Sequence, residues 1–169
     1  MSEVPDYVID TSFLTQPNRD YYAFDICPSF WESLSRLVIE RKVETIDKVR
    51  KEIMNGSYDD ELKKWIRPQP SFFVISTDEQ DVIDEYGRLN RRVQADKNFT
   101  NPAKAEFADI KNADGWVVSY AKVRRKKVLS QEVYSAGAKN KVPIPNLCKE
   151  LGIPHLNITQ FLREMKIQI

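Results

Sequence analysis

Short apolar segments typical of buried strands alternate with amphipathic helical segments along most of this chain. Tyr7–Leu14 is predicted as a strand, and Pro28–Arg41 as a helix with apolar residues at helical spacing. Val43–Ile46 is predicted as a second strand, followed by a helix that Asp47 caps and that ends at Gly56. Because strands that alternate with helices need crossover connections, this pattern predicts a mostly parallel sheet with helices on both faces.

The rest of the chain is predicted to be helical in its middle and to return to the sheet at its end. Helices are expected at Asp59–Trp65, at Asp78–Ala95, from Pro102 with Asn101 as its cap, and at Asp114–Arg124. Later elements are a strand at Lys127–Ser130, a helix at Pro145–Leu151, a short strand near His155 and a helix begun by Thr159. At 169 residues we expect one three-layer α/β/α domain over residues 1–169, with residues 78–111 as a helical insertion.

Composition narrows the class of protein without naming a partner. The 26 Lys and Arg against 25 Asp and Glu leave a net charge of +1, so a site for a polyanion depends on local clusters of charge. Cys27 and Cys148 lack the spacing of a zinc site or a disulfide framework, which favours a reducing setting. No apolar run approaches the roughly 18 residues of a membrane span. We therefore expect a soluble, cytoplasmic protein without membrane association.

Four carboxylates fall where the predicted strands end. Asp10 lies toward the end of the first strand, and Glu52 lies in the helix after the second. Asp114 begins a helix that leads back into a strand, and Glu132 follows that strand. Ligands of open parallel sheets bind at this edge. Four acids gathered there would repel one another and raise one another's pKa values unless a cation neutralised them.

The oxygen ligands of such a site indicate which cation it would hold. Hard carboxylate oxygens suit Mg²⁺ or Mn²⁺. Thr11 and Ser12 would act as hydroxyl donors that orient Asp10 or a bound water. A divalent cation makes bound water more acidic and stabilises the leaving oxygen of a phosphodiester. The predicted reaction class is therefore metal-dependent phosphodiester hydrolysis.

These segments resemble the motifs of the PIN-domain nucleases. YVIDTSF, VRKEI, ADGWVVSYA and VLSQE appear in the order and context of that family and cover nearly the whole chain. The ending KVPIPNLCKELGIPHLNITQFL resembles a branch of PIN proteins related to VapC-type toxins. The resemblance implies that Asp10, Glu52 and Asp114 are three acids of the site. It places Ser130 and Glu132 where the family usually has its Thr-x-Asp corner.

The resemblance also carries expectations about activity and partners. It implies an endoribonuclease that depends on Mg²⁺ or Mn²⁺ and is the toxin of a type II toxin–antitoxin pair. An RNA substrate, an antitoxin protein and homodimerisation are expected on the same ground. The main alternative is a non-catalytic RNA- or protein-binding domain with a vestigial acidic site. A haloacid dehalogenase type of phosphatase is less favoured, since Ser12 stands where the second Asp of its Asp-x-Asp signature belongs.

Each acid also has a structural interpretation. Asp10 would serve as a turn or cap residue, Asp114 as an N-cap, and Glu52 as a solvated helix residue. Asp109 competes with Asp114, although it lies at the end of the preceding helix. Glu44, inside a predicted strand, is expected to be structural. The joint placement of the four acids favours a shared metal site over these separate interpretations.

Two clusters of basic residues are weak candidates for contacts with RNA. They are either solvated surface or groups that meet RNA phosphates, and the second role would make binding strongly salt-dependent. The arginines in question are Arg88, Arg91, Arg92, Arg124 and Arg125.

Overall fold

A parallel sheet forms the centre of the protein, in a computed structural model that describes residues 5–169. The strands are β1 (Tyr7–Ile9), β2 (Val43–Ile46), β3 (Val74–Ile75), β4 (Lys127–Leu129) and β5 (His155–Leu156). Their order across the sheet is β3-β2-β1-β4-β5, and every pair of neighbours is parallel. The chain therefore winds outward in both directions from β1. Residues 1–4 of the predicted domain lie outside the described residues.

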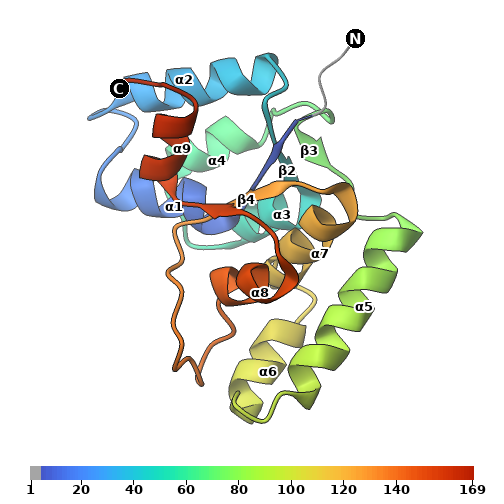
Figure 1. The fold of residues 1–169 in the computed structure, drawn as a ribbon. Coiled ribbons are helices and arrows are strands. Elements are labelled where there is room, and N and C mark those ends of the chain that lie inside the picture. The colour runs from blue at the N-terminus through green and yellow to red at the C-terminus, as the bar shows by residue number, and fades with distance from the viewer. Residues whose placement is uncertain (1–4) are drawn as a thin grey trace.

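Helices cover both faces of this sheet. They are α1 (Thr11–Asp20), α2 (Pro28–Ile39), α3 (Asp47–Asn55), α4 (Asp60–Ile66), α5 (Gln80–Ala95), α6 (Asn101–Ala108), α7 (Asp114–Arg124), α8 (Ile144–Leu151) and α9 (Ile158–Glu164). Figure 1 shows α2, α4 and α9 on one side of the sheet and α5, α7 and α8 on the other. The predicted α/β fold with a parallel sheet between helical layers is confirmed.

Alternate residues of the central strands face the two layers. Tyr7 of β1 packs edge-on against Phe161 of α9, with ring centroids 5.1 Å apart. Glu44 of β2 points the other way and accepts a hydrogen bond from Tyr120 of α7. Val8 and Ile9 are completely buried. This burial on both faces explains why strands of only two to four residues hold their place in the sheet.

The prediction of one strand over Tyr7–Leu14 is wrong in its second half. The strand ends at Ile9, and α1 begins at Thr11. Asp10 adopts an extended backbone conformation and its side chain accepts a hydrogen bond from the Ser12 N–H, so it is the N-cap of α1. The apolar residues after Asp10 are therefore buried on a helix rather than along a strand.

Two other caps are displaced by one residue. Ile46 occupies the N-cap position of α3, and Asp47 lies in the first turn, where its Oδ1 accepts a hydrogen bond from Thr77. Thr100, rather than Asn101, caps α6. The bounds of β2 and α7 agree with prediction, and the predicted starts and ends of the other helices agree to within two residues wherever a start or end was predicted. The pattern does not predict β3, a strand of two residues.

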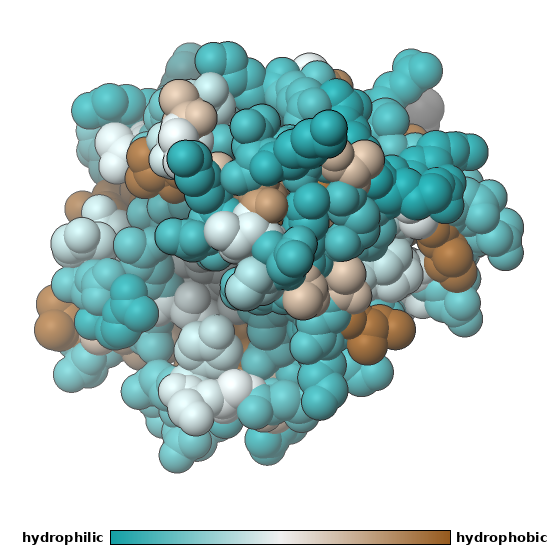
Figure 2. Space-filling view, turned by 90° about the horizontal axis from the view of Figure 1, so that it is seen from below, coloured by the Kyte–Doolittle hydropathy of each residue, from teal (hydrophilic) through white to brown (hydrophobic). Residues whose placement is uncertain are grey.

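The predicted insertion, residues 78–111, contains α5 and α6. It is tied to the rest of the protein by an ion pair between Glu85 of α5 and Lys122 of α7, at 2.6 Å. Seen from below, the protein presents a mainly hydrophilic surface with scattered hydrophobic residues (Figure 2). No helix within residues 5–169 combines the length and the apolar character needed to cross a bilayer.

Candidate metal centre

A cleft of about 390 Å³ lies at the carboxyl edge of the sheet, and all four predicted acids line it. Asp10 follows β1 and Glu132 follows β4, the two adjacent strands at which the direction of winding reverses. Glu52 comes from α3, and Asp114 is the first residue of α7. The topology thus gathers four residues that are far apart in the sequence. Ligand sites of doubly wound sheets form at this switch point.

Asp10 is buried, and its two carboxylate oxygens have different surroundings. Oδ2 accepts hydrogen bonds from the Ser12 hydroxyl at 2.7 Å, the Ser12 N–H at 3.3 Å and the Ser130 hydroxyl at 3.2 Å. Oδ1 is buried too, yet it accepts no hydrogen bond from any residue in the described range 5–169. Burial first, and then the charge of Glu132, raise the pKa of Asp10 to about 6. An oxygen in this state is stabilised by a proton, by an ordered water or by a cation.

The predicted hydroxyl groups divide into two that hold Asp10 and one that does not. The Ser12 hydroxyl accepts a hydrogen bond from the Gln131 N–H at 3.0 Å and lies 3.1 Å from the Ser130 hydroxyl. Ser12 and Ser130 therefore fasten Asp10 to the chain that leaves β4. Thr11 lines the cleft, but its buried hydroxyl makes no hydrogen bond within residues 5–169.

Asp114 and Glu52 meet at the start of α7. The Glu52 carboxylate accepts a hydrogen bond from the Ala113 N–H at 2.9 Å, so Glu52 is not a purely solvated helix residue. Ala113 occupies the N-cap position, and Asp114 lies in the first turn of the helix, where the dipole favours a negative charge. Burial, followed by the charges of Asp10 and Glu132, nevertheless raises the pKa of Asp114 well above its ordinary value.

Glu132 differs from the other acids because both of its oxygens are engaged. Oε1 accepts a hydrogen bond from Lys141 Nζ at 2.7 Å, and Oε2 accepts one from the Ile144 N–H at 2.7 Å. Lys141 also lines the cleft. It lies in the loop between β4 and α8, where no periodic pattern marks it, so sequence reasoning missed it.

Asn112 is a second functional residue that the sequence analysis missed. Its side-chain oxygen accepts a hydrogen bond from the Asp114 N–H at 2.9 Å and so helps to set the start of α7. An Asn two residues before a helix-initiating Asp is a recognisable turn signal. Asp109, the competitor of Asp114, also lines the cleft, but its carboxylate accepts a hydrogen bond from the Lys111 N–H in the turn after α6.

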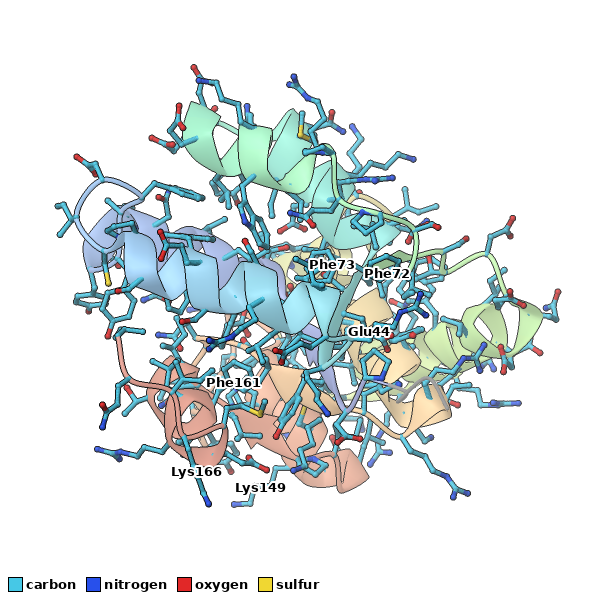
Figure 3. All side chains as sticks on the ribbon, turned by 90° about the horizontal axis from the view of Figure 1, so that it is seen from above. Glu44, Phe72, Phe73, Lys149, Phe161 and Lys166 are labelled. Carbon is cyan, nitrogen blue, oxygen red and sulfur yellow. The ribbon has the colours of Figure 1, made fainter. Side chains whose placement is uncertain are left out.

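Glu44 is buried and does not line the cleft; Figure 3 labels it near the middle of the molecule. It accepts a hydrogen bond from the Tyr120 hydroxyl at 2.7 Å and pairs with Lys126 at 3.3 Å. Its predicted structural role agrees with these contacts.

The five arginines proposed for RNA contact are set apart from the acids, and none of them, all within the described range, lines the cleft. Arg88 pairs with Glu85, Arg92 with Glu150, and Arg124 with Asp81. Arg125 is the left-handed C-cap of α7. An RNA phosphate would have to compete with these intramolecular ion pairs, so the arginines remain weak candidates.

The donor set of the cleft fits a hard divalent cation. Its side chains offer carboxylate and hydroxyl oxygens, and Asp10 Oδ1 is buried without a hydrogen-bond partner in the described chain. No three Asp, Glu, His or Cys side chains of the described residues already form a metal-ligand cluster. Glu52 and Glu132 are instead bonded to backbone N–H groups. Coordination by Glu52 or Glu132 would therefore require side-chain rotation or loss of these bonds, whereas Asp10 Oδ1 accepts no hydrogen bond within residues 5–169 while Ser12 and Ser130 hold Oδ2.

A protein-family model matches residues 7–169, which run from the first residue of β1 to the last residue of the sequence. The chain belongs to DUF4411. The family is described as a domain of unknown function, and a search of curated proteins gives no significant match. All four acids and Lys141 lie inside the DUF4411 match. The cleft is thus part of the unit that defines the family.

Proposed function

We propose that this protein is a metal-dependent endoribonuclease of the PIN type. The observation that carries the proposal is Asp10 Oδ1, a buried oxygen that no described residue hydrogen-bonds, in a cleft with three further carboxylates. A fold with no function for this edge would be expected to supply a donor to Oδ1, as Ser12 and Ser130 do for Oδ2, or to pair Asp10 with a cation. The arrangement is instead what a site for an external cation requires.

The residues of the cleft would have different roles in this reaction. Asp10 and Asp114 would hold Mg²⁺ or Mn²⁺, with Glu52 as a third acid, while Ser12 and Ser130 fix the orientation of Asp10. The bound cation would supply a more acidic water and stabilise charge on the leaving oxygen. The volume of the cleft is within the range of ligand sites. Since its walls are acidic, binding of an RNA phosphate would depend on that cation.

In the cell, the protein would act in the cytoplasm as the toxin of a type II toxin–antitoxin pair. This part of the proposal rests on the resemblance of the chain to VapC-type proteins. An antitoxin would suppress activity by inserting a segment near the acidic cleft, and homodimerisation belongs to the same expectation.

The test is cleavage of a mixed-sequence RNA by purified protein with Mn²⁺, with Mg²⁺ and with EDTA. Asp10→Asn is compared with Asp109→Asn, which makes the same chemical change in a turn residue of the same cleft. We expect cleavage that needs metal, survives in Asp109→Asn and falls more than about 100-fold in Asp10→Asn, beyond the usual effect of an outer-shell residue. Cleavage in EDTA, or full activity of a folded Asp10→Asn protein, would refute the proposal.

A second candidate function is RNA or protein binding without catalysis. Glu132 favours it, because Lys141 and the Ile144 N–H engage both of its oxygens without a metal. A thermal shift separates the two candidates: a site that holds Mn²⁺ raises the melting temperature. A melting temperature that Mn²⁺ leaves unchanged, together with an absence of cleavage, would favour binding alone. The phosphatase alternative is disfavoured because the hydroxyl of Ser12 donates to Asp10 where a second Asp would stand.

A further inference from the structure

We infer that Lys141 takes the place of a second metal ion in the acidic cleft. The cleft would then bind one divalent ion, and the lysine ammonium would supply the other positive charge. This inference rests on the proposed metal-dependent function and refines it. It reassigns Glu132 from a metal ligand to the partner of a lysine.

Both carboxylate oxygens of Glu132 already accept a hydrogen bond. Its Oε1 accepts a hydrogen bond from Lys141 Nζ at 2.7 Å, and its Oε2 accepts one from the Ile144 N–H at 2.7 Å. Ile144 is the first residue of α8, so this N–H is one that no turn of the helix can satisfy. A metal at Glu132 would have to displace a charged donor, a helix-terminal donor, or both. Each displacement costs a charge-assisted hydrogen bond.

The Lys141 ammonium is positioned to act on the acids of the cleft. The side chain of Lys141 is 54% exposed and that of Glu132 is 13% exposed, so the pair sits at the boundary between the cleft and solvent. Asp114 and Asp10 also attract the ammonium. Lys141 is thus paired with one acid of the cleft and lines the same cleft as the other three, so its ammonium supplies a positive charge where a second cation would act.

The two remaining buried acids, Asp10 and Asp114, would hold the single divalent ion. Asp10 Oδ1 accepts no hydrogen bond within residues 5–169, and Asp114 is buried at the start of α7. Lys141 forms its ion pair with Glu132, and neither Asp10 nor Asp114 forms an ion pair with a described residue. A single divalent ion would meet them. The half-exposed ammonium beside it would help to position an RNA phosphate at the mouth of the cleft.

The test counts bound ions, so its readout does not depend on cleavage. Isothermal titration with Mn²⁺ is performed on the wild-type protein, on Lys141→Met and on Lys111→Met, a matched loss of another lysine that lines the cleft. We expect one Mn²⁺ per chain in the wild-type protein and in Lys111→Met. We expect two in Lys141→Met, because Glu132 is then released to bind a second ion.

Two further variants keep the inference falsifiable if Lys141→Met does not fold. Lys141→Arg retains the positive charge and should bind one ion. Glu132→Gln should also bind one ion with an affinity within about threefold of the wild-type value, since Glu132 is not a ligand in this account. A ligand would lose about tenfold or more.

The outcomes distinguish this inference from the proposed function. Two ions in the wild-type protein, or a large loss of affinity in Glu132→Gln, would overturn the role of Lys141 and leave the nuclease intact. One ion in both the wild-type protein and a folded Lys141→Met would do the same. No Mn²⁺ binding by the wild-type protein would overturn the proposed function, and the inference with it.

Discussion

Asp10, which directly follows β1, and Glu44, on the neighbouring strand β2, are two buried carboxylates with very different surroundings. Burial raises the pKa of both. Glu44 accepts a hydrogen bond from Tyr120 and pairs with Lys126, so its charge is compensated inside the protein. Asp10 lies instead among other acids, with one oxygen that accepts no hydrogen bond from any described residue. The difference between the two carboxylates is therefore not burial but the absence of a cationic partner and the unbonded Oδ1 at Asp10.

The largest effect on stability is expected when the compensated charge is removed. Glu44→Gln leaves Lys126, which is 5% exposed, without its ion-pair partner. Loss of one partner of a buried pair should lower the free energy of unfolding by about 3 kcal/mol or more. Urea unfolding measures this change. Glu150→Gln, which breaks an exposed pair with Arg92, is the control and should change stability by less than about 1 kcal/mol.

Of the two buried carboxylates Asp10 and Glu44, only Asp10 should respond to added metal. At a free concentration of 100 times the dissociation constant, Mn²⁺ should stabilise the wild-type protein by about 2.7 kcal/mol through linkage. Thermal unfolding should show the shift in the wild-type protein and lose it in Asp10→Asn. Equal shifts in the two proteins would mean that the ion binds elsewhere.

Without metal, Asp10→Asn should stabilise the fold at neutral pH. The pKa of Asp10 is about 6 in the folded protein, against an ordinary value of 3.8, so the folded state binds the proton more tightly than the unfolded state. The ionised carboxylate therefore lowers stability above pH 6, and this cost disappears as the pH falls below about 4. Asn is as good an N-cap as Asp, so α1 should be preserved.

Unfolding in EDTA over a range of pH measures this effect. Asp10→Asn should exceed the wild-type protein by about 3 kcal/mol at pH 7.5 and converge with it near pH 4. A variant less stable than the wild-type protein at pH 7.5 would show that the charge of Asp10 is compensated after all.

The smallest expected effect concerns the hydroxyl groups that hold Asp10. Ser130→Ala removes a donor to Asp10 and the acceptor of the Glu132 N–H, which should cost about 1 kcal/mol. Ser119→Ala is the matched control, because its buried hydroxyl donates only to the Gly115 carbonyl within α7. Unfolding should show similar losses for both variants. Mn²⁺ titration should show weaker binding, by about tenfold, for Ser130→Ala alone.

The elements that could be predicted from the sequence are those with clear start and stop residues at their ends. Val43–Ile46 is a run of strand-forming residues followed by a charged helix, and α7 begins at an Asp and ends before a basic turn. The end of the first strand was predicted wrongly because apolar residues continue past Asp10. Only the cap hydrogen bond between Asp10 and Ser12 shows where the strand ends. Propensity could not place that boundary, since Thr and Phe are compatible with a strand.

The candidate site could be assembled from topology, whereas its charge balance could not. A parallel sheet brings strand ends together, so the positions of Asp10, Glu52 and Asp114 in the chain sufficed to place them at one edge. The role of Lys141 could not be predicted from the sequence, because it depends on how the loop between β4 and α8 folds back onto Glu132. The same limit applies to Arg124 and its neighbours, whose partners lie on other helices.

The most direct test of the metal centre is anomalous diffraction from crystals grown with Mn²⁺. This account predicts one strong peak in the acidic cleft, within coordination distance of Asp10 Oδ1, and Lys141 still paired with Glu132. A cleft without an anomalous peak at a saturating Mn²⁺ concentration would contradict it.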